Sequence, residues 1–172
     1  NVIKLFGGLT LPYDEDLRSR VLEASQYDVP IMELVRLERD ITLHHAEAIA
    51  SLMKELPRES EGTSLIGFHG HTIRHNANEH LTLQIGNPWL LAEKTGMRVV
   101  SDFRRHDMAL GGTGGPLAPM FHWALFPNAP RPTAIINLGG VANVTWLGEN
   151  GEIIAGDTGP GCGLLDEWIQ EM

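Results

Sequence analysis

Asp157 is the acidic side chain with the strongest chemical setting in this chain. It lies in residues 154–163 (IAGDTGPGCG), where one carboxylate stands among four glycines directly after an apolar run. Glycines let a polyanion approach the backbone because no Cβ stands in the way, and a helix starting near Leu164 would add the positive end of its dipole. The stretch therefore predicts a phosphate-binding loop that carries one acid.

A second glycine-rich turn occupies residues 137–143 (NLGGVAN), with two candidate strands between it and the first loop. The predicted contacts to nucleotide phosphates are Asn137, Gly139, Gly140 and Asn143 in this turn, and Gly159 and Gly161 in the later loop. The alternative for residues 137–143 is a tight hairpin with glycine at positive φ. Two such loops in one β-rich unit favour a nucleotide site.

Asp157 is a candidate general base. A hydrolytic or phosphoryl-transfer step needs a proton acceptor near the reacting atoms, and such help contributes about 10²–10⁴ in rate. Positioning and charge neutralisation supply much of the remainder in phosphoryl transfer. The alternative is that Asp157 caps a turn or the helix near Leu164. Asp102 is its main rival as the base.

Another polar group follows the strand predicted at residues 97–100. It contains Asp102, Arg104, Arg105 and Asp107. Ligands gather at the carboxyl ends of strands in α/β sheets, and the arginine fork suits a carboxylate because it donates two hydrogen bonds. The alternative is a surface cluster of ion pairs, which is a common arrangement of such residues in loops.

The histidine-rich segment 69–75 (HGHTIRH) supports a hypothesis of another class. With His106 and Asp107 it could form the metal site of a hydrolase. His69 and His71 would point to one face of a strand, which favours metal ligation. The glycine between them and the threonine after them fit a substrate-binding turn equally well, and we assign no metal ligand among these residues.

Composition limits the possible functions. The 172 residues are 42% apolar and 20% charged, with no apolar run long enough to span a bilayer, which predicts a soluble globular protein. The net charge of −9 without a dense basic cluster disfavours binding to nucleic acid or anionic membranes. A single cysteine, Cys162, excludes an intramolecular disulfide, which favours a reducing cytoplasmic setting.

Helices and strands alternate in the predicted order. Apolar residues at three- and four-residue steps predict a short helix after residue 14 and a long one from residue 31, with Asp28 as its cap. Strands are expected at 65–68, 81–85 and 97–100, with a helix from Asn87 to Gly96 between the last two, and this order implies that those two strands form a parallel pair. After a helix at 117–126, three further strands are expected at 134–137, 143–147 and 152–155, the last two joined by a hairpin turn.

Six motifs in this chain occur in one order and with similar spacing in a known family. They are residues 67–75, 83–88, 99–107, 111–117, 137–143 and 156–161. Together they resemble the anhydro-N-acetylmuramic acid kinase family of the sugar kinase/Hsp70/actin superfamily. Six ordered motifs are a far more specific signal than any lone glycine pattern.

The resemblance implies an incomplete α/β fold of sugar kinase/Hsp70/actin-like (ribonuclease H-like) architecture. Residues 1–127 would form most of the first, sugar-binding lobe, residues 133–172 the start of the second, nucleotide-binding lobe, and the proline-rich segment 128–132 the boundary. The N-terminal Gly-Thr-Ser-x-Asp-Gly phosphate loop and the C-terminal half would be missing. This stretch alone is then expected to be inactive.

The implied activity is a cytoplasmic step of peptidoglycan recycling. The family opens the 1,6-anhydro ring of an amino sugar by adding water and phosphorylates the released 6-oxygen, using ATP and Mg²⁺. Asp157 would be the base. The residues expected to bind the sugar are His69, Gly70, Thr72, Asp102, Arg104 and Asp107.

Several alternatives stay open. The family usually has Gln where His71 stands and Gln or a similar residue near Thr113, which leaves the exact sugar open. A metal-dependent hydrolase and a noncatalytic kinase-like binding module remain as other functions. Apolar residues of an unfinished domain would favour a homodimer.

Overall fold

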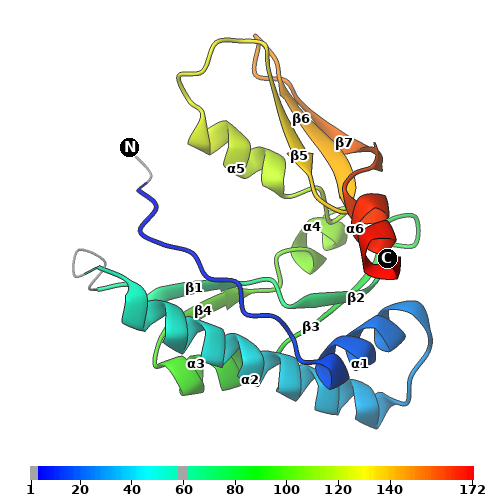
Figure 1. Cartoon of the computed structure of the whole chain (residues 1–172). Coiled ribbons are helices and arrows are strands. Elements are labelled where there is room, and N and C mark those ends of the chain that lie inside the picture. Colours follow the sequence, from blue (N-terminus) through cyan, green and yellow to red (C-terminus); the bar gives the residue numbers. More distant parts are fainter. Residues whose placement is uncertain (1–3, 58–61) are drawn as a thin grey trace. The chain divides into compact units, whose positions relative to one another are not determined.

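A computed structural model describes residues 4–57 and 62–172 (Figure 1). Helices and strands are mixed along the chain, which confirms the predicted α/β class. The chain forms two compact units, Asn1–Gly114 and Gly115–Met172. Within the described ranges, no helix has both the length and the apolar character needed to cross a membrane.

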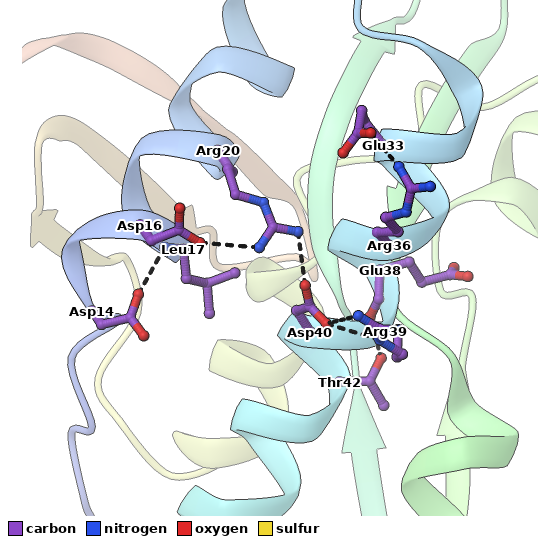
Figure 2. Close-up of polar contacts among 10 residues, drawn as sticks. All are labelled: Asp14, Asp16, Leu17, Arg20, Glu33, Arg36, Glu38, Arg39, Asp40 and Thr42. Carbon is purple, nitrogen blue, oxygen red and sulfur yellow. Dashed lines mark hydrogen bonds and ion pairs between the residues drawn. The ribbon is translucent and has the colours of Figure 1, made fainter.

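Helices α1 (Glu15–Gln26) and α2 (Ile31–Glu55) open the first unit. Asp14 caps α1 by accepting a hydrogen bond from the Leu17 amide at 2.8 Å. Arg20 of α1 reaches Asp40 of α2 at 2.7 Å and Asp16 at 3.2 Å, so one guanidinium ties the helices together (Figure 2). Burial alone would raise the pKa of Asp40, but hydrogen bonds from Arg20 and Arg39 outweigh it and lower that pKa.

The cap predicted for α2 is wrong. Pro30 occupies the N-cap position, with no side-chain hydrogen bond to the helix. Asp28 instead meets Arg74 at 3.3 Å. The same arginine donates to the carbonyls of Ala24, Ser25 and Tyr27 at the end of α1, where a cation complements the helix dipole.

The strands of the first unit pair differently from the prediction. Strand β4 (Arg98–Ser101) pairs in parallel with β1 (Leu65–Phe68), not with β3 (Leu81–Ile85). β3 pairs antiparallel with β2 (His71–Asn76), a segment for which the sequence left a strand and a substrate-binding turn open. The turn between β2 and β3 is short and held by the Asn76 side chain, which favours this local hairpin.

Two apolar clusters hold these elements together. One joins α1 and α2 to β2 and β3 through Leu17, Val21, Ala24, Leu37, Ile41, Ile73 and Ile85. The other joins α2 and β1 to α3 (Pro88–Thr95) through Ala46, Phe68 and Leu91. As predicted, Asn87 caps α3 and Gly96 ends it in the left-handed conformation. The clusters fix the carboxyl ends of β1 and β4 at one sheet edge.

The second unit is a three-stranded antiparallel sheet with helices. β5 (Thr133–Leu138), β6 (Val141–Leu147) and β7 (Ile153–Pro160) lie in the order β5-β6-β7 (Figure 1). α5 (Ala118–Leu125) contacts β6 and β7 in this unit, and α6 (Gly163–Glu171) follows β7. His122 of α5 bonds the buried Thr145 hydroxyl at 2.9 Å.

The division into units lies earlier than the predicted lobe boundary. It falls between Gly114 and Gly115, and α5 packs with the sheet of the second unit. The boundary at residues 128–132 refers to the lobes of a whole kinase and stays a prediction.

Candidate functional site

The predicted sugar-binding residues of the first unit gather where β1 and β4 end. His69 and Gly70 follow β1, and Asp102 and Arg104 follow β4. Because the strands are parallel, both sets lie at the same sheet edge. Arg104 Nε donates to His69 Nε2 at 2.8 Å, so residues far apart in the sequence are in direct contact.

A short helix missed from the sequence, α4 (Arg105–Ala109), organises the glycine-rich segment after it. The Gly114 amide donates to Asp107 Oδ2 at 2.8 Å, and the Gly112 amide donates to the Asp107 carbonyl at 2.9 Å. A Cβ on Gly112 would lie 2.2 Å from the Asp107 carboxylate, so this close approach requires glycine. Asp107 therefore holds the glycine-rich segment 112–114 in place.

A cavity of about 150 Å³ lies where β1 and β4 end. Its polar lining consists of His69, Gln84, Ser101, Asp102 and Arg105. Arg105 donates to Asp102 Oδ1 at 2.8 Å, and both side chains are exposed. Asp102 has φ of 60°, a conformation that is uncommon for a residue other than glycine and is enriched at ligand sites.

Gln84 is a cavity residue that the sequence prediction missed. Its position inside the motif at residues 83–88 was the available signal. The Gln84 amide donates to Thr72 Oγ1 at 3.3 Å and to Thr82 Oγ1 at 2.7 Å. Thr72 thus lies next to a cavity residue, although it does not line the cavity itself.

His71 is held apart from the cavity. Its Nε2 lies 3.3 Å from Ser25 Oγ, and that hydroxyl donates to the Val21 carbonyl at 2.8 Å. The imidazole therefore donates to Ser25. Burial lowers the pKa of His71, and the charges of the neighbouring His45 and His69 lower it further.

The metal-hydrolase hypothesis finds no donor set in the part of the chain that the structure describes. Across residues 4–57 and 62–172, no three His, Cys, Asp or Glu side chains are placed to share an ion. His69 also has both ring nitrogens engaged, Nε2 with Arg104 and Nδ1 with the Gly70 carbonyl at 3.0 Å.

In the second unit, the predicted base and two predicted phosphate contacts lie in one row across the sheet. Asn137 of β5 lies opposite Asn143 of β6, and Asn143 lies opposite Asp157 of β7. Paired residues in neighbouring strands project to the same face of a sheet. Asp157 was expected in a loop, and this part of the prediction is wrong, because pairing with β6 extends β7 to Pro160.

The two predicted glycine loops contact each other. The amides of Gly161 and Gly163 donate to the Gly140 carbonyl at 2.9 and 3.4 Å, and the Cys162 amide donates to the Gly139 carbonyl at 2.7 Å. A Cβ on Gly161 would lie 2.2 Å from the Gly139 oxygen. Because the Gly161 amide is used inside the protein, the amides of Gly139 and Gly140 are better placed as donors. Neither donates a hydrogen bond among the described residues.

The family model for anhydro-N-acetylmuramic acid kinase matches residues 1–172, which is the whole sequence. The chain belongs to the anhydro-N-acetylmuramic acid kinase family. This confirms the resemblance carried by the six motifs and the sugar kinase-like α/β fold expected from it.

Curated members of the anhydro-N-acetylmuramic acid kinase family are similar along most of the chain. The kinase of Zymomonas mobilis is 41% identical over 91% of this chain and 43% of its own length. The kinase of Acidiphilium cryptum is 44% identical over 94% of this chain and 44% of its own length. That of Brucella canis is 40% identical over 99% of this chain and 48% of its own length. The chain thus spans less than half the length of these relatives.

Proposed function

We propose that this chain supplies sugar-binding and phosphate-binding residues of an ATP-dependent anhydro-N-acetylmuramic acid kinase. The observation that carries the proposal is the row of Asn137, Asn143 and Asp157, next to the glycine tip of the β5–β6 hairpin. A carboxylate, two amides and free backbone donors are the groups that water activation and phosphate binding require.

Asp157 is the base in the proposed reaction. Its carboxylate accepts a proton from water while the water oxygen bonds to the anomeric carbon of the anhydro sugar. The bond from that carbon to the 6-oxygen breaks, and the released oxygen bonds to the γ-phosphorus of ATP as ADP leaves. The products are the 6-phosphosugar and ADP, and the water oxygen stays at the anomeric carbon.

The hairpin tip is the proposed phosphate contact. The Gly139 and Gly140 amides would donate to the β- and γ-phosphates, with Gly159 and Gly161 shaping the neighbouring backbone. Mg²⁺ takes oxygen ligands, and the amide oxygens of Asn137 and Asn143 fit that preference, directly or through water. When bound, Mg²⁺ neutralises charge on the phosphates.

The cavity of the first unit is the proposed sugar site. Asp102, with its exposed carboxylate, would accept hydrogen bonds from sugar hydroxyls. His69, Gly70, Thr72, Arg104 and Asp107 form or support the same site. Arg105 lines the cavity and Arg104 does not, so Arg105 is the better candidate to hold the acid group of the sugar.

The wider context is also part of the proposal. Residues 1–127 and 133–172 would belong to the sugar-binding and nucleotide-binding lobes of a longer chain, joined at 128–132. The enzyme would act in the cytoplasm in peptidoglycan recycling, as a homodimer, and residues 1–172 alone would be inactive.

Isotope labelling tests the proposed reaction. The full reading frame is expressed and given ATP, Mg²⁺ and anhydro-N-acetylmuramic acid in oxygen-18 water. Mass spectrometry is expected to find a 6-phosphosugar with one label at the anomeric carbon and none in the phosphate. Absence of a phosphorylated sugar, or label in the phosphate ester, would refute the proposal.

A further inference from the structure

Arg104 joins two segments of the first unit that lie far apart in the sequence. Its Nε donates to His69 Nε2 at 2.8 Å, and its Nη1 donates to the Gly114 carbonyl at 2.8 Å. Hydrogen bonds from a charged guanidinium are among the stronger ones in proteins, and its planar fork fixes the direction of both. The half-buried side chain is therefore committed to partners inside the protein.

The contact determines which nitrogen of His69 carries the proton. A guanidinium only donates, so His69 Nε2 must offer its lone pair. The proton of the neutral ring is then on Nδ1, which donates to the Gly70 carbonyl at 3.0 Å. A continuous chain of hydrogen bonds results, from the Gly114 carbonyl through Arg104 and His69 to Gly70.

Close packing holds both ends of this series of hydrogen bonds. At one end, Gly70 has φ of 70°, and a Cβ there would lie 2.4 Å from the Ile85 carbonyl oxygen. At the other end, the Gly114 amide donates to Asp107, and a Cβ on Gly114 would lie 2.8 Å from Met108. A displacement of Arg104 would therefore disturb two closely packed segments.

We propose that Arg104 is a positioning residue of the sugar site, not a ligand of the sugar acid group. It selects the Nδ1-protonated tautomer of His69 and sets the distance between residues 69–70 and the glycine-rich segment 111–114. Because His69 and Gly70 line the cavity, the position that Arg104 gives them shapes the place where an acidic amino sugar binds. The inference rests on the proposed function of that cavity.

Nitrogen-15 NMR of the full-length protein tests the tautomer without any turnover. In the wild type at neutral pH, the His69 ring is expected to show a protonated Nδ1 and an unprotonated Nε2. In Arg104→Gln this preference is expected to weaken, while Arg98→Gln keeps it, since Arg98 contacts Ser64 and lies outside the cavity lining. A wild-type ring protonated on Nε2 would overturn the proposal.

Kinetics test the consequence for binding. Arg104→Gln is expected to raise KM for the sugar about tenfold or more, because two charge-assisted hydrogen bonds are lost. KM for ATP should stay within about twofold, since such losses act where the bonds were made. Arg104→Lys keeps the charge without the fork and should lie between the two, and it replaces the Gln variant if that one does not fold.

An unchanged KM for the sugar in the Lys and Gln variants would overturn the proposal, as would an equal rise in KM for ATP. If the wild type does not phosphorylate the sugar, the proposed function fails, and calorimetric titration of the sugar into wild type and Arg104→Lys then decides the matter. Equal affinities in that titration would also overturn the positioning role.

Discussion

The two groups of candidate residues differ in how fully their polar atoms are paired. In the first unit, Arg104 bonds His69, Arg105 bonds Asp102, and Asp107 bonds the Gly114 amide. In the second unit, the side chains of Asn137, Asn143 and Asp157 form no hydrogen bond with other described residues, although they lie in one row. The first group is already organised by the protein, whereas the second can give its hydrogen bonds to a ligand.

Asp157 provides the largest test of this contrast. Asp157→Asn keeps the size of the side chain and removes the proton acceptor, so turnover should fall by about 10²–10⁴. Binding of ATP, measured by calorimetry, should persist. The matched control is Asp166→Asn, which removes an acid from the first turn of α6 in the same unit.

Normal turnover in Asp157→Asn would exclude Asp157 as the base and would favour Asp102 of the first unit. Equal losses in the Asp157 and Asp166 variants would indicate a general effect of charge.

Gly161 tests whether the row of Asn137, Asn143 and Asp157 depends on the contact between Gly161 and Gly139. Gly161→Ala places a Cβ against the Gly139 carbonyl and should lower the free energy of unfolding by about 1–3 kcal/mol. Gly140→Ala is the matched variant, because a Cβ there meets no atom within 4 Å. Its effect on stability should stay within about 0.5 kcal/mol.

Urea unfolding of both glycine variants measures this difference. Equal stability of the two would mean that the contact between Gly139 and Gly161 does not hold the hairpin tip.

Arg105 tests whether an exposed member of the paired group can still bind a ligand. Arg105→Gln should raise KM about tenfold for a sugar that carries a carboxylate, because the bidentate donor is lost. A matched anhydro sugar without the carboxylate should show the same KM with both enzymes. A similar rise for both sugars would assign Arg105 a structural role with Asp102.

His71 provides the smallest effect, and it concerns stability. Its pKa is lowered in the folded chain, first by burial and then by His45 and His69, so the unfolded chain binds the proton at higher pH. The free energy of unfolding should therefore fall as the pH drops below about 6.5 toward the folded pKa. His71→Gln removes this protonation, so the variant should lose less stability than the wild type when the pH falls from about 7 to about 5.

Urea unfolding at both pH values measures the difference. Equal losses in wild type and His71→Gln would show that His71 does not contribute to the acid sensitivity of the fold.

Local signals in the sequence predicted the ends of α3 and the β6–β7 turn, although the cap expected for α2 was wrong. Asn87 and Gly96 mark the two ends of α3, because a side-chain oxygen caps its start and a left-handed glycine ends it. The turn at residues 148–151 joins β6 and β7 as expected, with Gly151 at φ of 89°. These features depend on neighbours in the sequence, so a pattern of a few residues is enough to find them.

Features that depend on distant partners were not predictable in the same way. The pairing of β1 with β4 follows from packing on α2 and α3, and no local pattern encodes it. Helix α4 is short and forms around contacts with residues 112–114. The row at Asn143 depends on a register shift between Ala142 and Asn143, which the sequence does not reveal.

The junction between the β5–β6 tip and residues 161–163 also determines where this part of the chain tolerates added length. One residue inserted within β6 or β7 would turn Asn143 or Asp157 to the opposite face of the sheet. The far end of the β6–β7 hairpin lies away from that junction: Glu149 and Asn150 are exposed at its tip, and an insertion between them keeps the Asn150 amide next to Glu152, to which it donates at 3.1 Å. An epitope tag or a fluorescent reporter is therefore best inserted between these two residues.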